Sequence, residues 1–175
     1  MRRLLLFRHS KAERPEPGSR DLARALTERG RADAALIGAY MARHALVPDR
    51  ALVSTAARTE ETWKHAVAAF RSAPATIADA RIYDASPQAL VDLIKATPDS
   101  VQALLVVGHN PGLHELALLL IASGDIDTRE RLREKLPTSG LAIIDFAFDD
   151  WTKLHPHSGR LERFVDPRSL AAPTN

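Results

Sequence analysis

Short apolar runs alternate along this chain with longer segments in which apolar residues recur at helical spacing, and this alternation limits the possible folds more than any other feature. Each run is too short for a helix and has the length of a buried strand. Strands are expected at residues 4–7, 51–53, 104–107 and 141–146. Helices are expected over about 28–45, 55–71, 87–95, 111–121 and 127–136. The alternation predicts an α/β fold, a three-layer sandwich whose mostly parallel central sheet has helices on both faces.

Polar residues stand where they can cap the starts of these helices. Thr27 and Ser54 precede two of them, and the pairs Ser86-Pro87 and Asn110-Pro111 precede two others. Side-chain oxygens at such positions accept hydrogen bonds from free amides of the first turn, and proline suits the first helical position. In the first helix, the residues noted at helical spacing are Ala32, Ala35, Leu36, Ala39, Tyr40 and Arg43.

The alternation continues without an internal repeat or a linker, which predicts one domain over residues 1–175. Its core spans about 3–168, and the segment after about Phe164 is expected to be an extended tail on the surface. Residues 11–25 hold two prolines, a glycine and many charges, so they are expected to form a loop. A chain of 175 residues can bury a proper core unaided.

Composition excludes several classes of protein. Cysteine is absent, which excludes a disulfide framework, a thiol nucleophile and a zinc site with cysteine ligands. The formal net charge of +2 is no footprint of nucleic-acid binding. No segment reaches the ~18 apolar residues of a membrane span, and the N-terminal apolar run is shorter than a signal peptide requires. We therefore expect a cytoplasmic protein without membrane or nucleic-acid partners, and the sequence leaves its oligomeric state open.

Basic residues follow three of the predicted strands. Arg8 and His9 end the first, Arg58 lies in the first turn of the helix after the second, and His109 follows the third. Each has an ordinary explanation alone, such as an ion pair between Arg58 and Glu61. Carboxyl ends of parallel strands share one edge of a sheet, so the four side chains are expected to converge. Two guanidinium groups match a tetrahedral anion such as phosphate, and a histidine beside it can attack phosphorus or give a proton.

An ordered set of motifs resembles the histidine phosphatase superfamily, the group that includes phosphoglycerate mutases and acid phosphatases. The likeness is greatest to its small members, the phosphohistidine phosphatases of the SixA type. The motifs are LLFRHSKA at residues 5–12, DLARALTERG at 21–30, VSTAARTEET at 53–62, YDASP at 83–87, VGHNPG at 107–112 and PTSG at 137–140.

The resemblance implies a histidine phosphatase fold and a role for each matching residue. His9 would be the nucleophile that carries a transient phosphoryl group, and Arg8, Arg58 and His109 would hold its oxygens. Water would then hydrolyse the phosphohistidine, with no metal and no cofactor. Positioning and electrostatics dominate phosphoryl transfer, which suits such a site. Further substrate-binding candidates are Ser10, Asn110, Ser139 and Asp84.

Two departures from the family pattern bear on the substrate. Ser10 stands where the wider superfamily usually has glycine, and no clear acid is visible to protonate a leaving oxygen. Asp84 and Glu13 are candidates, although a surface or capping role is the simpler explanation for each. A dedicated acid is less necessary for a phosphohistidine, because its P–N bond breaks readily once the nitrogen is protonated, and solvent can supply that proton. The expected partner is therefore a phosphorylated protein.

Other functions stay open at this point. A small phosphoester is the second choice of substrate, and a phosphoglycerate mutase-like phosphotransferase is the alternative enzyme. A mutase needs extra chain over the site to exclude water, and 175 residues leave little for such a lid. A phosphate-binding module without catalysis is the alternative from another class. The presence of both His9 and His109 argues against it, because a binder needs no nucleophile.

Overall fold

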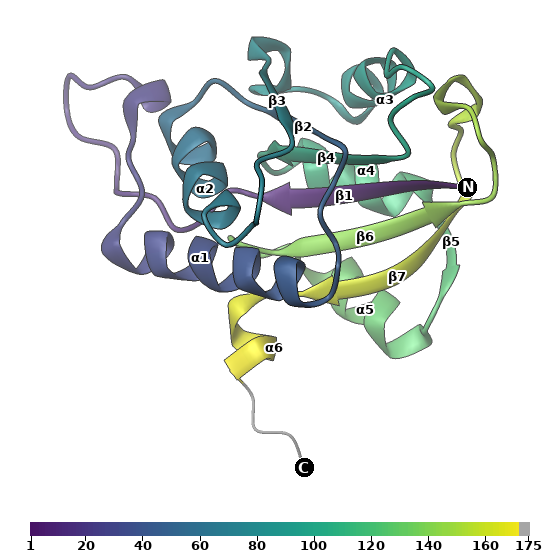
Figure 1. Ribbon diagram of the computed structural model, residues 1–175. Helices are drawn as coiled ribbons and strands as arrows, with labels where there is room; N and C mark the ends of the chain where they lie inside the picture. Colours follow the sequence, from purple (N-terminus) through teal and green to yellow (C-terminus); the bar gives the residue numbers. More distant parts are fainter. Residues whose placement is uncertain (172–175) are drawn as a thin grey trace.

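The computed structural model describes residues 1–171 and shows a seven-stranded sheet in the order β3-β2-β4-β1-β6-β7-β5 (Figure 1). The strands are β1 (Arg2–Arg8), β2 (Arg50–Val53), β3 (Ala75–Ala78), β4 (Ala103–Gly108), β5 (Ile121–Gly124), β6 (Leu141–Phe146) and β7 (Gly159–Val165). Strand β1 is parallel to β4, β2 to both β4 and β3, and β5 to β7, whereas β6 is antiparallel to β1 and β7. The expected mostly parallel α/β sheet is confirmed.

Helices cover both faces of this sheet. They are α1 (Glu28–Arg43), α2 (Ala57–Val67), α3 (Pro87–Lys95), α4 (Gly112–Leu120), α5 (Ile126–Glu134) and α6 (Pro167–Ala171). Helices α1 and α2 lie in front of the sheet in Figure 1, and α3, α4 and α5 lie behind it. None of the helices within residues 1–171 is long and apolar enough to cross a membrane.

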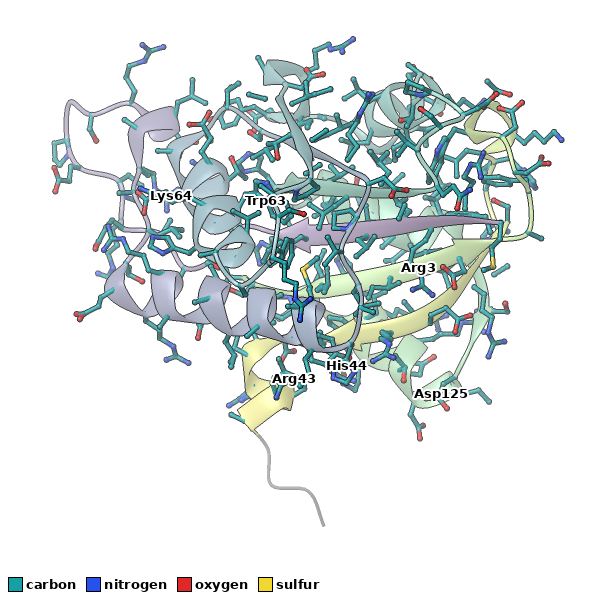
Figure 2. All side chains as sticks on the ribbon, viewed as in Figure 1. Arg3, Arg43, His44, Trp63, Lys64 and Asp125 are labelled. Atoms are coloured by element: carbon teal, nitrogen blue, oxygen red, sulfur yellow. The ribbon has the colours of Figure 1, made fainter. Side chains whose placement is uncertain are left out.

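Strand β1 is apolar from Leu4 to Phe7 because it packs against both layers of helices. Leu4 and Leu6 belong to the core under α3 and α4, while Leu5 and Phe7 belong to the core under α1 and α2. Side chains alternate along a strand, so a strand buried on both faces is a continuous apolar run. Trp63 of α2 lies in the second core, between the helix and the sheet (Figure 2).

Three strands and the end of the chain differ from the expectation. Strands β3, β5 and β7 were not predicted: β3 is exposed throughout, β5 follows α4 with no break, and β7 carries charges at alternate positions. The prediction of an extended tail after Phe164 is wrong for the residues that follow directly, because β7 runs to Val165 and α6 follows. Residues 172–175 lie outside the described residues.

Two of the four predicted helix caps are confirmed. The Thr27 and Ser86 side chains each accept a hydrogen bond from the amide three residues ahead, at 2.9 and 3.1 Å. The other two are wrong: α2 begins after Ala56 and α4 after Pro111, so neither Ser54 nor Asn110 is the cap. Both of those side chains bond to other groups at the carboxyl edge of the sheet.

Candidate active site

Two histidines lie side by side where the parallel strands β1 and β4 end. Arg8 is in register with Gly108, so the residues that follow, His9 and His109, leave the sheet together. The amide of His9 donates to the carbonyl of Gly108 at 3.1 Å. The ring centroids of the two histidines are 5.3 Å apart, and each residue is only 9% exposed. The register of β1 and β4 thus produces the predicted histidine pair.

The ring of His9 is held in one orientation. Its Nδ1 lies 2.8 Å from the carbonyl oxygen of Ser10, which can only accept, so Nδ1 carries the proton. Burial is the main cause that lowers the pKa of His9 to about 4, and the charges of Arg8 and Arg58 contribute to this shift. His9 is therefore neutral at pH 7, with a free lone pair on Nε2. A lone pair on a fixed, neutral imidazole is the requirement for a histidine nucleophile.

His109 has one partner and one unpaired nitrogen. Its Nε2 lies 2.8 Å from the hydroxyl oxygen of Ser54, which explains why Ser54 does not cap α2. Its Nδ1 is buried with no hydrogen-bond partner. Burial lowers the pKa of His109 to about 3, and the proximity of His9 and Arg58 contributes. When the Ser54 hydroxyl donates to Nε2, Nδ1 carries the proton and is a free donor.

Arg8 and Arg58 each use part of the guanidinium group and leave part of it free. Arg8 Nη1 donates to the carbonyl of Leu136 at 3.0 Å. Arg58 Nη1 and Nη2 donate to the carbonyl and carboxylate of Asp21, each at 3.0 Å. The Nε atoms of both arginines are buried without a partner. Two guanidinium groups and His109 thus gather donors and positive charge at one edge of the sheet, an arrangement that suits a bound anion.

Asp21 is a candidate site residue that sequence reasoning missed, although it lies in the quoted DLARALTERG motif. It anchors Arg58, which therefore faces the histidines instead of Glu61, and Glu61 pairs with Arg31 at 3.2 Å. The Tyr83 hydroxyl also donates to the Asp21 carboxylate, and the Tyr83 ring packs edge-on against His109. These hydrogen bonds hold the pKa of Asp21 well below its usual range. Asp21 stays ionised and cannot act as an acid at neutral pH.

Asn110 and Asp84 line a pocket beside His109. The Asn110 amide nitrogen donates to the Leu136 carbonyl at 2.8 Å, the same oxygen that holds Arg8. The Asn110 side-chain oxygen is buried and unpaired. Asp84 has a positive φ of 54° and lines a pocket of 240 Å³ together with His109 and Asn110. The exposed Glu13 does not line this pocket, so Asp84 is the better placed of the two candidate acids.

Known proteins resemble this chain over nearly its whole length. An uncharacterized protein of Mycobacterium tuberculosis is 37% identical over 164 residues, which cover 93% of this chain and all of the relative. The structure of a protein of Agrobacterium tumefaciens named as the phosphohistidine phosphatase SixA is 33% identical. It covers 95% of this chain and 98% of its own, with a TM-score of 0.80. The chain belongs to the histidine phosphatase superfamily. It is a phosphatase of that group.

Other comparisons agree with this histidine phosphatase assignment at the level of the fold. A SixA structure from Nakamurella is 24% identical, covers 95% of this chain and 96% of its own, and has a TM-score of 0.82. No family model matches the chain. The superfamily resemblance inferred from the ordered motifs is therefore confirmed by whole structures.

Ser10 and Ser139 support the backbone of His9 in this histidine phosphatase site. Their hydroxyls bond to each other, both residues are fully buried, and the Ser139 amide donates to the His9 carbonyl at 3.1 Å. The Ser10 amide donates to the Thr62 hydroxyl at 2.9 Å. Both serines thus hold the His9 backbone, and in the described structure their hydroxyls face each other. Residues 1–171 contain no cluster of three or more His, Asp or Glu side chains able to hold a metal.

Proposed function

We propose that this phosphatase removes phosphoryl groups from phosphohistidine in proteins, through a phosphohistidine intermediate on its own His9. The supporting observation is the neutral His9 beside three unpaired buried donors, Arg8 Nε, Arg58 Nε and His109 Nδ1. A phosphoryl dianion supplies the acceptors that these donors lack. Donors fixed in a site of low dielectric stabilise transition-state charge more than they would in water.

The reaction proceeds in two steps. The lone pair of His9 Nε2 forms a bond to phosphorus as the substrate's P–N bond breaks, and the protonated substrate imidazole leaves as a neutral ring. Water then attacks phosphorus on the other side, the bond to His9 breaks, and phosphate leaves. Arg8, Arg58 and His109 hold the oxygens in both steps. We propose that no metal is required.

The leaving group supports a phosphohistidine substrate. An alkoxide needs an acid to protonate it, and the carboxylate that Arg58 holds, Asp21, is ionised by its partners. A phosphoimidazole can bring its own proton from solvent. The similarity to a structure named as a phosphohistidine phosphatase supports the same substrate class.

A small phosphoester is the second candidate substrate, and the pocket of 240 Å³ beside His109 favours it. A leaving group in this pocket would lie near Asp84, the one candidate acid that lines it. Replacement Asp84→Asn separates the two substrates: it should slow hydrolysis of an alkyl phosphate and leave phosphohistidine hydrolysis unchanged. Equal losses on both substrates would contradict this separation.

The replacement His9→Ala tests the proposal. Wild type and variant are assayed with an aryl phosphate and with a histidine-phosphorylated protein, both with metal chelated. We expect the variant to lose at least ~10³-fold in kcat on both substrates, because the nucleophile is removed. His65→Ala, a half-buried histidine of α2, is the matched control and should keep full activity. Labelled phosphoenzyme, quenched in alkali because acid hydrolyses phosphohistidine, should carry its label on His9. Retained turnover in His9→Ala would overturn the mechanism.

A further inference from the structure

A broad groove of 1020 Å³ begins next to the candidate active site and has no part in the chemistry described above. One end is formed by Lys11 and Thr138. Lys11 follows the buried Ser10, and Thr138 precedes the buried Ser139, so this end is built from the two segments that hold His9. The other end is formed by α6, which lies beside α1 (Figure 1). Val165, just before α6, pairs with Leu141, which pairs with Phe7, so the groove runs along the same edge of the sheet as the candidate site.

Cationic side chains dominate the walls of this groove. All five are exposed, and they come from four separate segments of the chain: Lys11, Arg29, Arg131, Lys135 and Arg168. Within residues 1–171, no carboxylate lies within 4.0 Å of Lys11, Lys135 or Arg168. Segments far apart in the sequence thus place unneutralised positive charge around one depression.

Three carboxylates also line the groove, and they leave a formal excess of two positive charges. Asp33 is paired with Arg29 at 3.7 Å, and Asp166 accepts a hydrogen bond from the Ser169 amide at 2.8 Å at the start of α6. Glu134 is the third carboxylate. The groove therefore keeps an excess of positive charge in a protein whose net charge is only +2. Such a local excess selects partners by charge complementarity.

The floor and size of the groove suit a polypeptide segment. Phe164 lies beneath the Arg131 guanidinium, which is 4.9 Å from the ring centroid, and Leu36 of α1 is 39% exposed on the wall. Pockets for small ligands reach about 1,000 Å³ only at the upper limit of their range and enclose the ligand. A groove of 1020 Å³ that mixes apolar and cationic groups fits an extended chain better than a small phosphoester.

We propose that this groove binds an acidic segment of the phosphorylated protein substrate and thereby presents its phosphohistidine to His9. This inference rests on the proposed function, because it names the class of protein that the site serves. The sequence around the phosphohistidine, rich in Asp and Glu, would lie along Lys11, Lys135 and Arg168. The expected substrate is then an acidic phosphoprotein.

Two synthetic peptides test this. Both carry one phosphohistidine, and one has four glutamates on one flank where the other has four glutamines. At low salt, wild type should hydrolyse the glutamate peptide with a kcat/KM about tenfold higher, and added NaCl should remove the difference because exposed charges are screened. Equal kcat/KM values for the two peptides in wild type would overturn the proposal without any variant.

Charge reversal locates the effect. The double replacement Lys135→Glu with Arg168→Glu should abolish the preference for the glutamate peptide while hydrolysis of an aryl phosphate is unchanged. The control is Lys64→Glu with Arg71→Glu, which makes the same charge change at two exposed residues that do not line the groove. Lys64 lies on α2 (Figure 2). The control should keep the preference. If the preference for the glutamate peptide survives reversal of Lys135 and Arg168, the groove does not bind the acidic segment.

A binding measurement separates failure of the groove from failure of the proposed function. The affinity of the unphosphorylated glutamate peptide is measured by fluorescence anisotropy, with wild type and the Lys135/Arg168 variant. If wild type binds the peptide and the variant does not, but wild type hydrolyses no phosphohistidine, the groove proposal stands and the proposed function is rejected. His9-dependent hydrolysis together with equal binding of the glutamate peptide by wild type and variant would reject the groove alone. Equal binding of a single-stranded DNA oligonucleotide would show a general polyanion surface and also reject it.

Discussion

The candidate active site and the groove beside it both gather positive charge, but they do so in different surroundings. Arg8 and Arg58 are largely buried and are fixed by backbone and carboxylate oxygens, while the groove cations are exposed and mostly unpaired. A buried, fixed charge acts at short range and resists salt, because little solvent screens it. Exposed charges act over several ångströms and weaken as salt rises. The candidate active site should therefore control the chemistry, and the groove should control the choice of partner.

Removal of a buried arginine should have the largest effect. We expect Arg8→Ala and Arg58→Ala each to lower kcat/KM by about 10²–10³-fold on an aryl phosphate, since each loses a donor to the transferring group. The loss should be the same at low and high NaCl. Arg58→Lys keeps the charge without the planar fork and should recover only part of the rate. Steady-state kinetics at two salt concentrations measures this. If high salt abolished the difference in kcat/KM between wild type and variant, the charges of the site would be screened like those of the groove.

Acid should destabilise the protein through the buried histidines. The unfolded chain binds a proton at His9 near pH 6.5, whereas the folded protein does so only near pH 4. Below pH 6.5 the unfolded state therefore binds more protons, and the free energy of unfolding falls as pH drops to about 4. This single group contributes a loss of about 3 kcal/mol over that window.

Urea unfolding of wild type and His9→Gln at pH 7 and pH 4.5 measures this contribution. The variant lacks the titrating group, so its free energy of unfolding should fall less between the two pH values. Carboxylates affect both proteins alike and cancel in the comparison. Equal losses of unfolding free energy in the two proteins would mean that protons reach His9 in the folded state. The candidate site would then not be more buried than the groove in the way described above.

Asp21 offers a smaller test of the same contrast. Asp21→Asn keeps the size of the side chain but weakens its hydrogen bond with Arg58, because the negative charge is removed. We expect kcat/KM for an aryl phosphate to fall about tenfold. Asp79→Asn is the control, because Asp79 pairs with an exposed arginine, Arg81, on the surface. No change in Asp21→Asn would show that Arg58 is positioned by its packing alone.

Salt should have the smallest effect, and only on the groove. Between 50 and 300 mM NaCl, kcat/KM for an acidic phosphoprotein should fall several-fold, while kcat/KM for an aryl phosphate should stay within about twofold. Parallel assays on the two substrates measure the ratio directly. Identical salt dependence on both would indicate that the two regions do not divide binding from chemistry as proposed.

The sequence predicted those parts of the fold in which local pattern and tertiary packing agree. The four central strands and the caps at Thr27 and Ser86 depend on short apolar runs and on contacts within one turn. The exposed edge strand β3 carries no such pattern. In α1, five of the six positions noted at helical spacing are exposed, Leu36 and Ala39 among them. The sixth, Tyr40, is buried, as are Ile37 and Met41, which the pattern did not single out. Alanine does not distinguish the two faces of a helix.

The candidate site was predictable where it follows strands, and not where it depends on contacts between distant segments. Arg8, His9 and His109 follow directly from the ends of β1 and β4. Asp21 reaches Arg58 from a loop 37 residues earlier, and only the packing of that loop against α2 reveals the contact. The acceptor for His9 Nδ1 is the carbonyl of the next residue, a backbone group present at every position and invisible to sequence patterns.

The position of β1 in the sheet has a consequence for synthesis of the protein. This strand is made before the rest of the sheet, and its hydrogen-bonding partners come much later: Arg3 pairs with Ala103 of β4 and with Asp145 of β6. A ribosome must therefore complete β6 before both edges of β1 are filled and His9 is fixed. Partners so distant in sequence slow folding. A nascent chain that ends before β6 should lack phosphatase activity, so the onset of catalysis would mark the completion of the central sheet.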